Sequence, residues 1–243
     1  MDYEQFKSQV FTLTQIDLSS YKEKQMKRRI DALILKNKFK GYDDYIIAIK
    51  KEKTLLEEFV NYLTINVSEF YRNPEQWKVL ETDILPELLK HGKNLKIWSA
   101  ACSTGDEPYT LVMLLSKYIP MSNISILATD LDKQVIEKAK LGLYSSKSLV
   151  GLPKEYKDKF FKVAGDNAYQ IDNSVKKCVQ FKQHNLLKDT YPTGYDLILC
   201  RNVLIYFTED AKEEVYRKFN SSLRSGGVLF VGSTEQIIKY KEL

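Results

Sequence analysis

From about residue 95 onward, short apolar runs alternate with segments of helical periodicity, and this alternation restricts the fold more than any other feature of the chain. The runs 95–101 and 124–129 are followed by helical segments at 108–118 and 133–141. A helix between two strands returns the chain across the sheet, so that the next strand runs in the same direction. Further strands are expected at 178–182, 196–200 and 228–232, with a helix at about 209–223. The predicted fold class is therefore α/β, with a doubly wound parallel sheet.

The first 65 residues contain helical patterns only. Two Ser/Thr-x-x-Glu sequences, Ser20–Glu23 and Thr54–Glu57, are typical of capping boxes and predict that helices begin there. Apolar residues then recur at helical spacing and predict one buried stripe, formed by Met26, Ile30, Leu33 and Ile34. We expect three parts along the chain: a helical N-terminal domain over 1–65, a linker helix over 66–90 and the α/β domain over 91–243.

Residues 145–182 do not fit a simple crossover between two strands. Within this stretch, Ala168–Ile171 and Val175–Phe181 are separated by the turn-like sequence Asp172–Ser174. This pattern predicts a small antiparallel hairpin, and therefore an inserted β-subdomain. A long insertion is either a decoration of the fold or an element of recognition.

The composition excludes several classes of protein. No apolar run exceeds five of the 243 residues, whereas a membrane helix needs ~20, and no secretory signal is visible at the N-terminus. The three cysteines are far apart and the two histidines are isolated, so a disulfide framework, a zinc site or a Ser-His-Asp triad is not expected. We expect a cytoplasmic protein that needs no metal.

The positive charge of the chain is concentrated in the helical segment. Between Ser19 and Lys53 there are 11 Lys and Arg against 5 Asp and Glu. On the helix that carries the apolar stripe, Lys24, Lys27 and Arg28 share the opposite face. Such a face is either simply solvated or a docking surface for an acidic partner.

In an open parallel sheet, ligands bind at the carboxyl ends of the strands. The first predicted strand runs into six small residues, Ala100–Gly105, and the next helix begins with Asp106 and Glu107. This segment has one glycine where a dinucleotide site has three, and the two carboxylates would repel a pyrophosphate. They suit a ligand with an ammonium or sulfonium group, and Asp130, at the end of the second strand, suits ribose hydroxyls. Together these features predict S-adenosylmethionine as the ligand.

The chain also resembles the CheR family of chemotaxis receptor methyltransferases, in the order and spacing of its motifs over nearly its whole length. The segments that carry the resemblance are Thr64–Arg72 (TINVSEFYR), Ile97–Tyr109 (IWSAACSTGDEPY), Ala128–Asp130 (ATD), His184–Leu187 (HNLL) and Cys200–Phe207 (CRNVLIYF). The resemblance implies methyl transfer from S-adenosylmethionine to glutamate side chains of transmembrane chemoreceptors, with S-adenosylhomocysteine as the product. It further implies recruitment to membrane receptor arrays and docking of the basic helix, through Lys24, Lys27 and Arg28, on the cytoplasmic helical region of the receptor. In some members of the family the β-subdomain holds the C-terminal tail of the receptor.

The resemblance also implies roles for individual residues. The positions that match cofactor contacts of the family are Asn66, Ser68, Arg72, Glu107, Asp130, Asn185, Leu186, Arg201 and Asn202. Glu107 matches the contact to the methionine amino group, and Asp130 matches the ribose acceptor. Arg72 and Tyr206 match the residues proposed to orient the substrate carboxylate, so both are candidate catalytic residues.

The chain departs from the family pattern in two places. Asp106 stands where many members have glutamate, and only ten residues follow Ser233, where a domain of this kind usually continues into a reversed last strand.

Two other functions compete with receptor methylation. A nucleic-acid methyltransferase of the same fold would carry an Asn/Asp/Ser-Pro-Pro-aromatic block or a Pro-Cys nucleophile, and the sequence has neither. The other candidate is a non-catalytic adaptor that binds S-adenosylmethionine and docks on receptors.

Overall fold

The computed structural model describes residues 1–90, 92–235 and 237, which form two compact units. The helical unit consists of Met1–Asn66 together with Leu204–Glu214. The sheet unit consists of Val67–Val203 and the chain from Val215 onward. The inclusion of Leu204–Glu214 in the helical unit has no counterpart in the sequence analysis.

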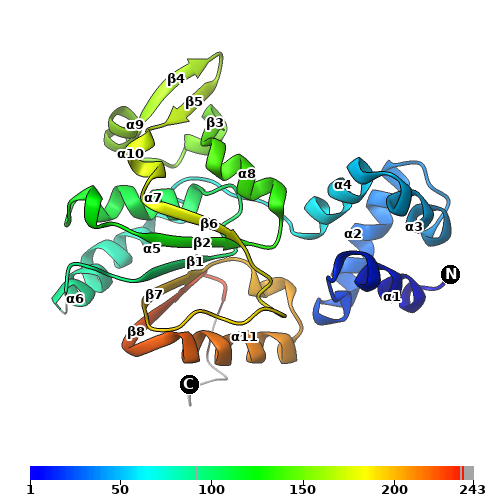
Figure 1. Ribbon diagram of the computed structural model, residues 1–243. Coiled ribbons are helices and arrows are strands. Elements are labelled where there is room, and N and C mark those ends of the chain that lie inside the picture. Colours follow the sequence, from blue (N-terminus) through cyan, green and yellow to red (C-terminus); the bar gives the residue numbers. More distant parts are fainter. Residues whose placement is uncertain (91, 236, 238–243) are drawn as a thin grey trace. The chain divides into compact units, whose positions relative to one another are not determined.

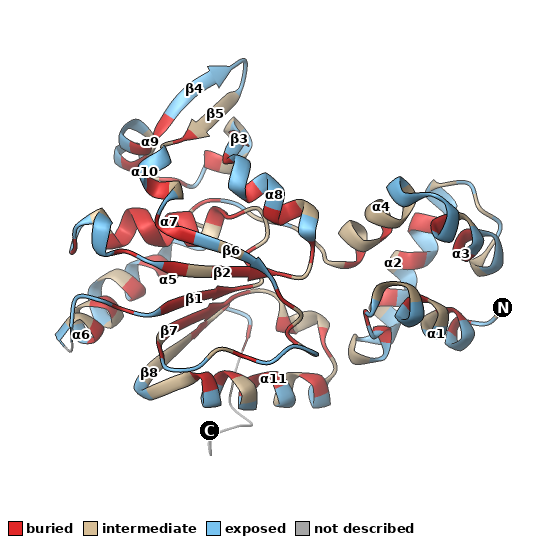
Figure 2. Ribbon diagram, viewed as in Figure 1, coloured by how far each residue is buried: buried red, intermediate tan, exposed pale blue. Residues whose placement is uncertain are grey.

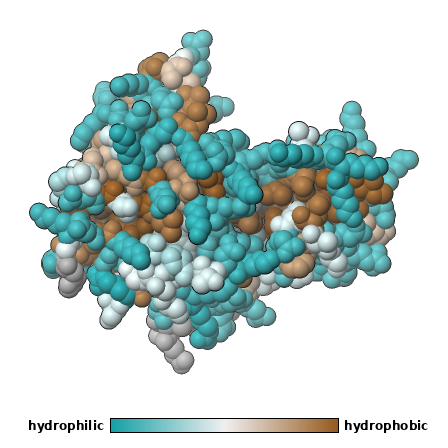
Figure 3. Space-filling view, viewed as in Figure 1, coloured by the Kyte–Doolittle hydropathy of each residue, from teal (hydrophilic) through white to brown (hydrophobic). Residues whose placement is uncertain are grey.

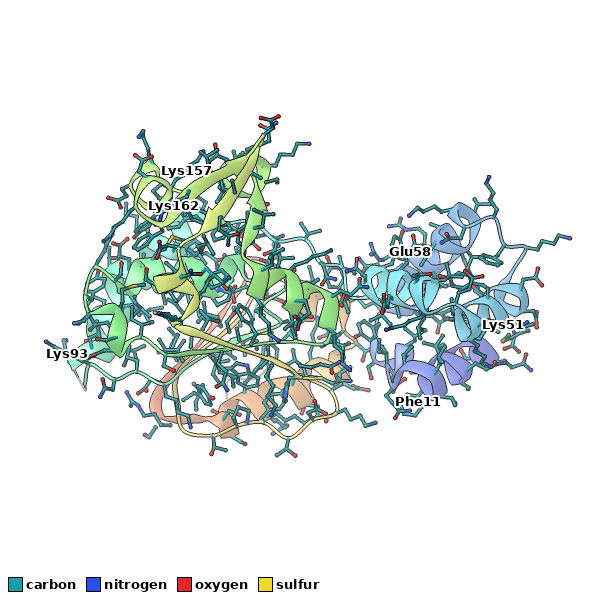
Figure 4. The ribbon with its side chains drawn as sticks, turned by 45° about the horizontal axis from the view of Figure 1, so that its top comes forward. Phe11, Lys51, Glu58, Lys93, Lys157 and Lys162 are labelled. Carbon is teal, nitrogen blue, oxygen red and sulfur yellow. The ribbon has the colours of Figure 1, made fainter. Side chains whose placement is uncertain are left out.

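The N-terminal helices of the helical unit are α1 (Tyr3–Thr14), η1 (Leu18–Ser20), α2 (Glu23–Lys36), α3 (Tyr42–Lys51) and α4 (Lys53–Leu63). The predicted apolar stripe on α2 is buried. Phe6, Tyr45 and Phe59, from the other helices, are also buried in the core of the helical unit. The Phe59 ring meets the other two edge to face, at centroid distances of 6.2 and 5.7 Å. On the surface, the Lys36 ammonium donates to the Glu58 carboxylate at 2.8 Å and joins α2 to α4. Figure 4 labels Glu58 on α4.

Both predicted capping boxes are wrong. Ser20 lies in η1, a separate turn capped by Asp17, and α2 begins after Lys22 without a side-chain cap. Helix α4 begins at Lys53, one residue before Thr54, because only Glu52 separates it from α3. The N-cap positions are therefore occupied by Lys22 and Glu52, and neither side chain caps its helix.

The sheet unit contains a parallel sheet of the predicted kind. In the described residues its strands are β1 (Ile97–Ala100), β2 (Ile126–Asp130), β6 (Val179–Gln183), β7 (Tyr195–Cys200) and β8 (Leu223–Val231), in the order β6-β2-β1-β7-β8. Every neighbouring pair is parallel. Since β2 and β7 flank β1, the chain changes direction across the sheet at β1, and a ligand site is expected at the carboxyl end of this strand. The α/β fold class is confirmed.

Helices cover both faces of this sheet (Figure 1). On one face lies α7 (Asp106–Leu115), whose apolar residues are all buried in the main core with Trp77, Leu80 and Leu88 (Figure 2). Also on that side are α8 (Lys133–Leu141), α5 (Pro74–Val79), a π-helical turn (Leu80–Ile84) and α6 (Leu85–Lys90). On the other face, α11 (Glu209–Ser222) packs Phe219 against Trp98 of β1, at a ring distance of 5.4 Å.

The inserted subdomain is a second, antiparallel sheet of β3 (Leu143–Ser145), β5 (Ala168–Ile171) and β4 (Phe161–Gly165), in the order β3-β5-β4. The short helices around it are η4 (Ser146–Leu149), α9 (Lys154–Phe160) and α10 (Asn173–Lys176). The predicted strand Ala168–Ile171 is present, but its expected hairpin partner, Val175–Phe181, is wrong. Asp172 caps α10 by accepting from the Ser174 N–H at 2.8 Å, and the residues that follow enter β6 of the main sheet.

The outer strand of the subdomain, β4, is largely exposed (Figure 2). Lys162 of β4 and Lys157 of α9 place two positive charges on this subdomain (Figure 4). The Lys157 ammonium lies 4.2 Å from the centre of the Tyr169 ring. The face in Figure 3 is mainly hydrophilic, with hydrophobic patches on each unit.

No helix within the described ranges is long and apolar enough to cross a membrane. The expectation about a reversed last strand falls on residues 236 and 238–243, which lie outside the described part of the chain.

Candidate active site

The loop after β1 is built from the small residues that the sequence singled out. Ala101, Ser103 and Gly105 adopt left-handed backbone angles, with φ of 58°, 48° and 89°. A Cβ atom at Gly105 would lie 2.9 Å from the Cβ of Ala139, so this position requires glycine. The loop is held to β2 by the Cys102 N–H, which donates to the Thr129 carbonyl at 2.9 Å. A narrow loop of small side chains at the carboxyl end of β1 lets a ligand approach the backbone.

Asp130 lies at the end of β2 and is buried. One of its carboxylate oxygens accepts from the Ser103 N–H at 2.8 Å, and the other accepts from the Asp132 N–H at 3.0 Å. A carboxylate has about four acceptor positions, so these two bonds leave capacity for the hydroxyls of a ribose. Burial raises the pKa of Asp130 to about 6, although the hydrogen bonds favour its ionised form.

Glu107 stands in the first turn of α7, next to the loop. Its carboxylate accepts from the Ser99 hydroxyl at 2.8 Å and lies 3.6 Å from the Arg201 guanidinium. Burial raises the pKa of Glu107, while Arg201 and Ser99 counteract that shift by stabilising the charged form. The arrangement fixes one carboxylate at the switch point of the sheet, where it suits an ammonium group.

Arg201 follows β7 directly and is 8% exposed. Besides Glu107, its guanidinium donates to the Arg72 carbonyl at 2.7 Å and to the Gln76 side-chain oxygen at 2.9 Å. The group lies over the Trp77 ring, 5.0 Å from its centre. Burial lowers the pKa of Arg201, and Glu107 opposes this effect. Arg201 therefore connects the carboxyl end of β7 to both Glu107 and the segment before α5.

Hydrogen bonds to its backbone carbonyl hold Arg72 in place. Its carbonyl accepts from the Trp77 indole N–H at 2.9 Å as well as from Arg201, and its own guanidinium donates to the Val67 carbonyl at 3.3 Å. Trp77, which the sequence analysis does not single out, thus fixes this residue directly, and Gln76 does so through its bond to Arg201. Gln76 also donates to the Val231 carbonyl at 3.1 Å, which ties α5 to the end of β8.

Ser68 lies on the same segment as Arg72. Its hydroxyl and that of Thr104 both hydrogen-bond to Asp106, whose pKa is raised by burial. Asp106, the departure from the family pattern, therefore anchors the segment 67–72 to the start of α7.

Asn185, Leu186 and Asn202 also follow strand ends. The Asn185 side-chain oxygen accepts from the Leu187 N–H at 2.9 Å and closes a turn after β6, in which Leu186 is buried. Asn202, after β7, has a left-handed backbone with φ of 61°. The sheet unit thus brings six strand-end candidates to one edge of the sheet: Glu107, Asp130, Asn185, Leu186, Arg201 and Asn202.

The remaining candidates belong to the helical unit. The Asn66 amide donates to the Thr64 hydroxyl at 2.8 Å. Tyr206 ends the short helix η5 (Leu204–Tyr206), and its carbonyl accepts from the Lys22 N–H at 2.9 Å. Lys24, Lys27 and Arg28 are all exposed on α2, opposite its buried stripe.

Known proteins resemble this chain over almost its entire length. Residues 1–64 match the family model "CheR methyltransferase, all-alpha domain", and residues 66–243 match "CheR methyltransferase, SAM binding domain". A chemotaxis protein methyltransferase of Listeria monocytogenes is 45% identical over 224 residues, which are 92% of this chain and 85% of that protein. A protein of the same name from Borreliella burgdorferi is 33% identical over 241 residues, which cover 94% of this chain and 85% of that protein. The division into an all-helical part and a cofactor-binding part agrees with the elements described above, and the chain belongs to the CheR methyltransferase family.

Proposed function

We propose that this protein transfers the methyl group of S-adenosylmethionine to glutamate side chains in the cytoplasmic helical region of chemoreceptors. The observation that carries the proposal is the placement of Glu107, Arg201 and Asp130 at the switch point of the sheet, in a chain of the CheR family. Glu107 offers a carboxylate for the methionine ammonium, Asp130 offers spare acceptors for the ribose, and Asn185 and Leu186 would contact the adenine. Ser68, Asn66, Arg72, Arg201 and Asn202 complete the set of cofactor contacts.

The chemistry needs little from the protein beyond orientation. The cofactor supplies a methyl group made electrophilic by its sulfonium. A glutamate side chain, with a pKa of ~4.3, is ionised at neutral pH and needs no general base to act as the nucleophile. An anion and a cation neutralise each other in this reaction, so tight pairing of the substrate carboxylate before transfer would slow it. Arg72 and Tyr206 therefore act as orienting groups, and Tyr206 does so as a neutral donor.

The basic face of α2 is the docking surface for the receptor. Receptor methylation regions are helical and acidic, and Lys24, Lys27 and Arg28 are exposed together on one helix. In this view the enzyme is cytoplasmic and is recruited to receptor arrays through that contact.

The experiment that tests the function is the transfer of tritiated methyl from S-adenosylmethionine to membranes that contain chemoreceptors. We expect label in the receptor that is released as methanol by mild base, because a carboxyl methyl ester is base-labile. Label in RNA would support a nucleic-acid methyltransferase, and cofactor binding without label in any receptor would support an adaptor. Either result would contradict the proposal.

Reversing the charge of the docking surface tests the contact with the receptor. The triple variant Lys24→Glu, Lys27→Glu, Arg28→Glu is expected to raise the KM for receptor about tenfold or more at low salt, because steering and docking by the basic face are lost. Its affinity for S-adenosylhomocysteine should stay unchanged. Reversal of three exposed lysines of the sheet unit, Lys78, Lys90 and Lys93, is the matched control and should leave this KM as it is. An equal effect of the two triple variants would contradict the assignment.

The pKa of Asp130 predicts how cofactor affinity depends on pH. Because the ionised carboxylate is a stronger acceptor with more acceptor positions than the protonated acid, the affinity for S-adenosylhomocysteine is expected to fall as the pH drops through about 6. The loss should approach tenfold for each pH unit below that value, since one pKa unit corresponds to ~1.4 kcal/mol. Calorimetric titration at a series of pH values measures it. In Asp130→Asn the affinity for S-adenosylhomocysteine should be low at every pH, and this pH dependence should be absent. If the pH dependence were unchanged in this variant, it would belong to another titrating group.

A further inference from the structure

The segment that carries Tyr206 is bonded on both sides to the residues just before α2. The Lys22 N–H donates to the Tyr206 carbonyl at 2.9 Å, and the Thr208 N–H donates to the Ser20 carbonyl at 2.9 Å. These two bonds make an isolated antiparallel bridge between Tyr21 and Phe207. Residues that are almost 190 positions apart in the sequence thus pair as a minimal sheet inside the helical unit.

Side chains reinforce this backbone pairing. The rings of Tyr21 and Phe207 meet edge to face, with centroids 5.0 Å apart and planes at 87°. This is the geometry that aromatic pairs prefer. Phe207 is 5% exposed, so its ring is shielded from solvent. Since Phe207 is the residue next to Tyr206, the pair restricts the backbone angles that direct the Tyr206 side chain.

The carbonyl of the same residue, Lys22, bonds to the helix that carries the basic face. The Lys22 carbonyl accepts from the Gln25 and Met26 N–H groups, at 3.1 and 3.0 Å, in the first turn of α2. Lys24 lies in this turn, and Lys27 and Arg28 in the next. The amide of Lys22 therefore bonds to the Tyr206 segment while its carbonyl bonds to the helix that carries the basic face.

We propose that Tyr21 is a positioning residue for Tyr206, which it holds in the orientation for methyl transfer through the bridge to Phe207. The inference rests on the proposed role of Tyr206 as a substrate-orienting donor. It adds that the start of the docking helix and the orienting tyrosine form one hydrogen-bonded structure. Tyr21 does not itself contact the reacting groups in this account.

A double-mutant cycle with Tyr21→Ala and Tyr206→Phe tests the inference in the full chain. Tyr21→Ala alone is expected to lower kcat for receptor methylation about tenfold, because small misplacement of an orienting group is costly. The affinity for S-adenosylhomocysteine should remain unchanged. In the Tyr206→Phe background the same substitution should change kcat less than about twofold, since residues that act through one another are not additive. Independent effects that multiply would overturn the inference, as would a loss of cofactor affinity that parallels the loss of kcat.

Two variants separate positioning from general damage to the fold. Tyr21→Phe keeps the ring and should retain nearly full activity. Phe39→Ala removes another half-buried ring of the helical unit, one that contacts Tyr45 instead of the Tyr206 segment, and should leave kcat unchanged. A kcat loss in Phe39→Ala as large as that in Tyr21→Ala would overturn the inference.

Hydrogen exchange gives a readout that does not depend on activity, so that a failure of the inference is distinguishable from a failure of the proposed function. The amides of Lys22 and Thr208, which form the bridge, should exchange at least about tenfold faster in Tyr21→Ala, because local opening of the bridge becomes easier. In Phe39→Ala they should stay protected. Unchanged protection in Tyr21→Ala would overturn the inference even if the enzyme methylates receptors as proposed.

Discussion

Replacing Glu107 with glutamine is expected to weaken the binding of S-adenosylmethionine about 10- to 100-fold, because a hydrogen bond to a charged group contributes ~1.5–3 kcal/mol. The amide is nearly isosteric and can still accept from the Ser99 hydroxyl, so the pocket should keep its shape. What is lost is the negative charge that Arg201 holds at this position. Calorimetric titration with S-adenosylhomocysteine measures the effect directly.

The matched control for this prediction is Glu75→Gln. Glu75 is exposed in the first turn of α5, just as Glu107 lies in the first turn of α7, so both substitutions remove a carboxylate from a helix N-terminus. The control should bind the cofactor as the wild type does. If Glu107→Gln bound equally well, Glu107 would be a structural partner of Arg201 and the ammonium would have to be recognised elsewhere.

The second large effect is expected at Glu235, which the sequence analysis did not single out. This residue is 8% exposed, and its carboxylate accepts three main-chain N–H groups. One oxygen accepts from Asn202 at 2.7 Å and Gly232 at 2.8 Å, and the other accepts from Val203 at 3.0 Å. A Cβ atom at Gly232 would lie 2.7 Å from this carboxylate, so the turn closes tightly around it. Glu235 thus joins the residues that follow β7 to the residue that follows β8.

Replacing Glu235 with alanine is expected to lower the free energy of unfolding of the sheet unit by about 3–5 kcal/mol, because buried donors lose a charged acceptor. Glu235→Gln keeps one accepting oxygen, so its free energy of unfolding should lie between those of Glu235→Ala and the wild type. Urea denaturation measures both. Thr234→Ala, which changes the exposed neighbouring residue, is the control and should have a stability within about 0.5 kcal/mol of the wild type. A stability of Glu235→Ala equal to that of this control would contradict the structural role.

The parts of the fold and site that could be predicted from the sequence depend on local signals. Lys133–Leu141 has helical periodicity, and Gly142 ends the helix in a left-handed conformation. Glu107 and Asp130 could be found because each directly follows an apolar strand, and strand ends meet at one edge of a parallel sheet.

The interactions that could not be predicted join residues that are distant in the chain. Gln76 contacts Arg201 and Val231, and Glu235 contacts Asn202, across separations that carry no periodic signal. The pairing of Tyr21 with Phe207 is of the same kind. Such contacts follow from the packing of elements after they form, and in a single sequence their residues look like ordinary polar or aromatic positions.

Errors in local structure had local causes. The strand β4, Phe161–Gly165, is mostly exposed and lacks a clear alternation of apolar and polar residues, so the sequence pattern does not indicate it as the hairpin partner of Ala168–Ile171. The turn predicted at Asp172 is present, but it begins a helix instead of a second strand. Asp and Ser favour both structures, and only the tertiary context decides between them.

Peptide mass spectrometry of a purified receptor cytoplasmic region, after incubation with this enzyme and S-adenosylmethionine, detects methyl transfer to individual glutamate residues. The account predicts added mass of one methylene on glutamate residues of the helical region, removed by mild base and greatly reduced when Glu107→Gln replaces the wild type at limiting cofactor. Receptor that gains no such ester, while the enzyme binds S-adenosylhomocysteine tightly, would contradict it.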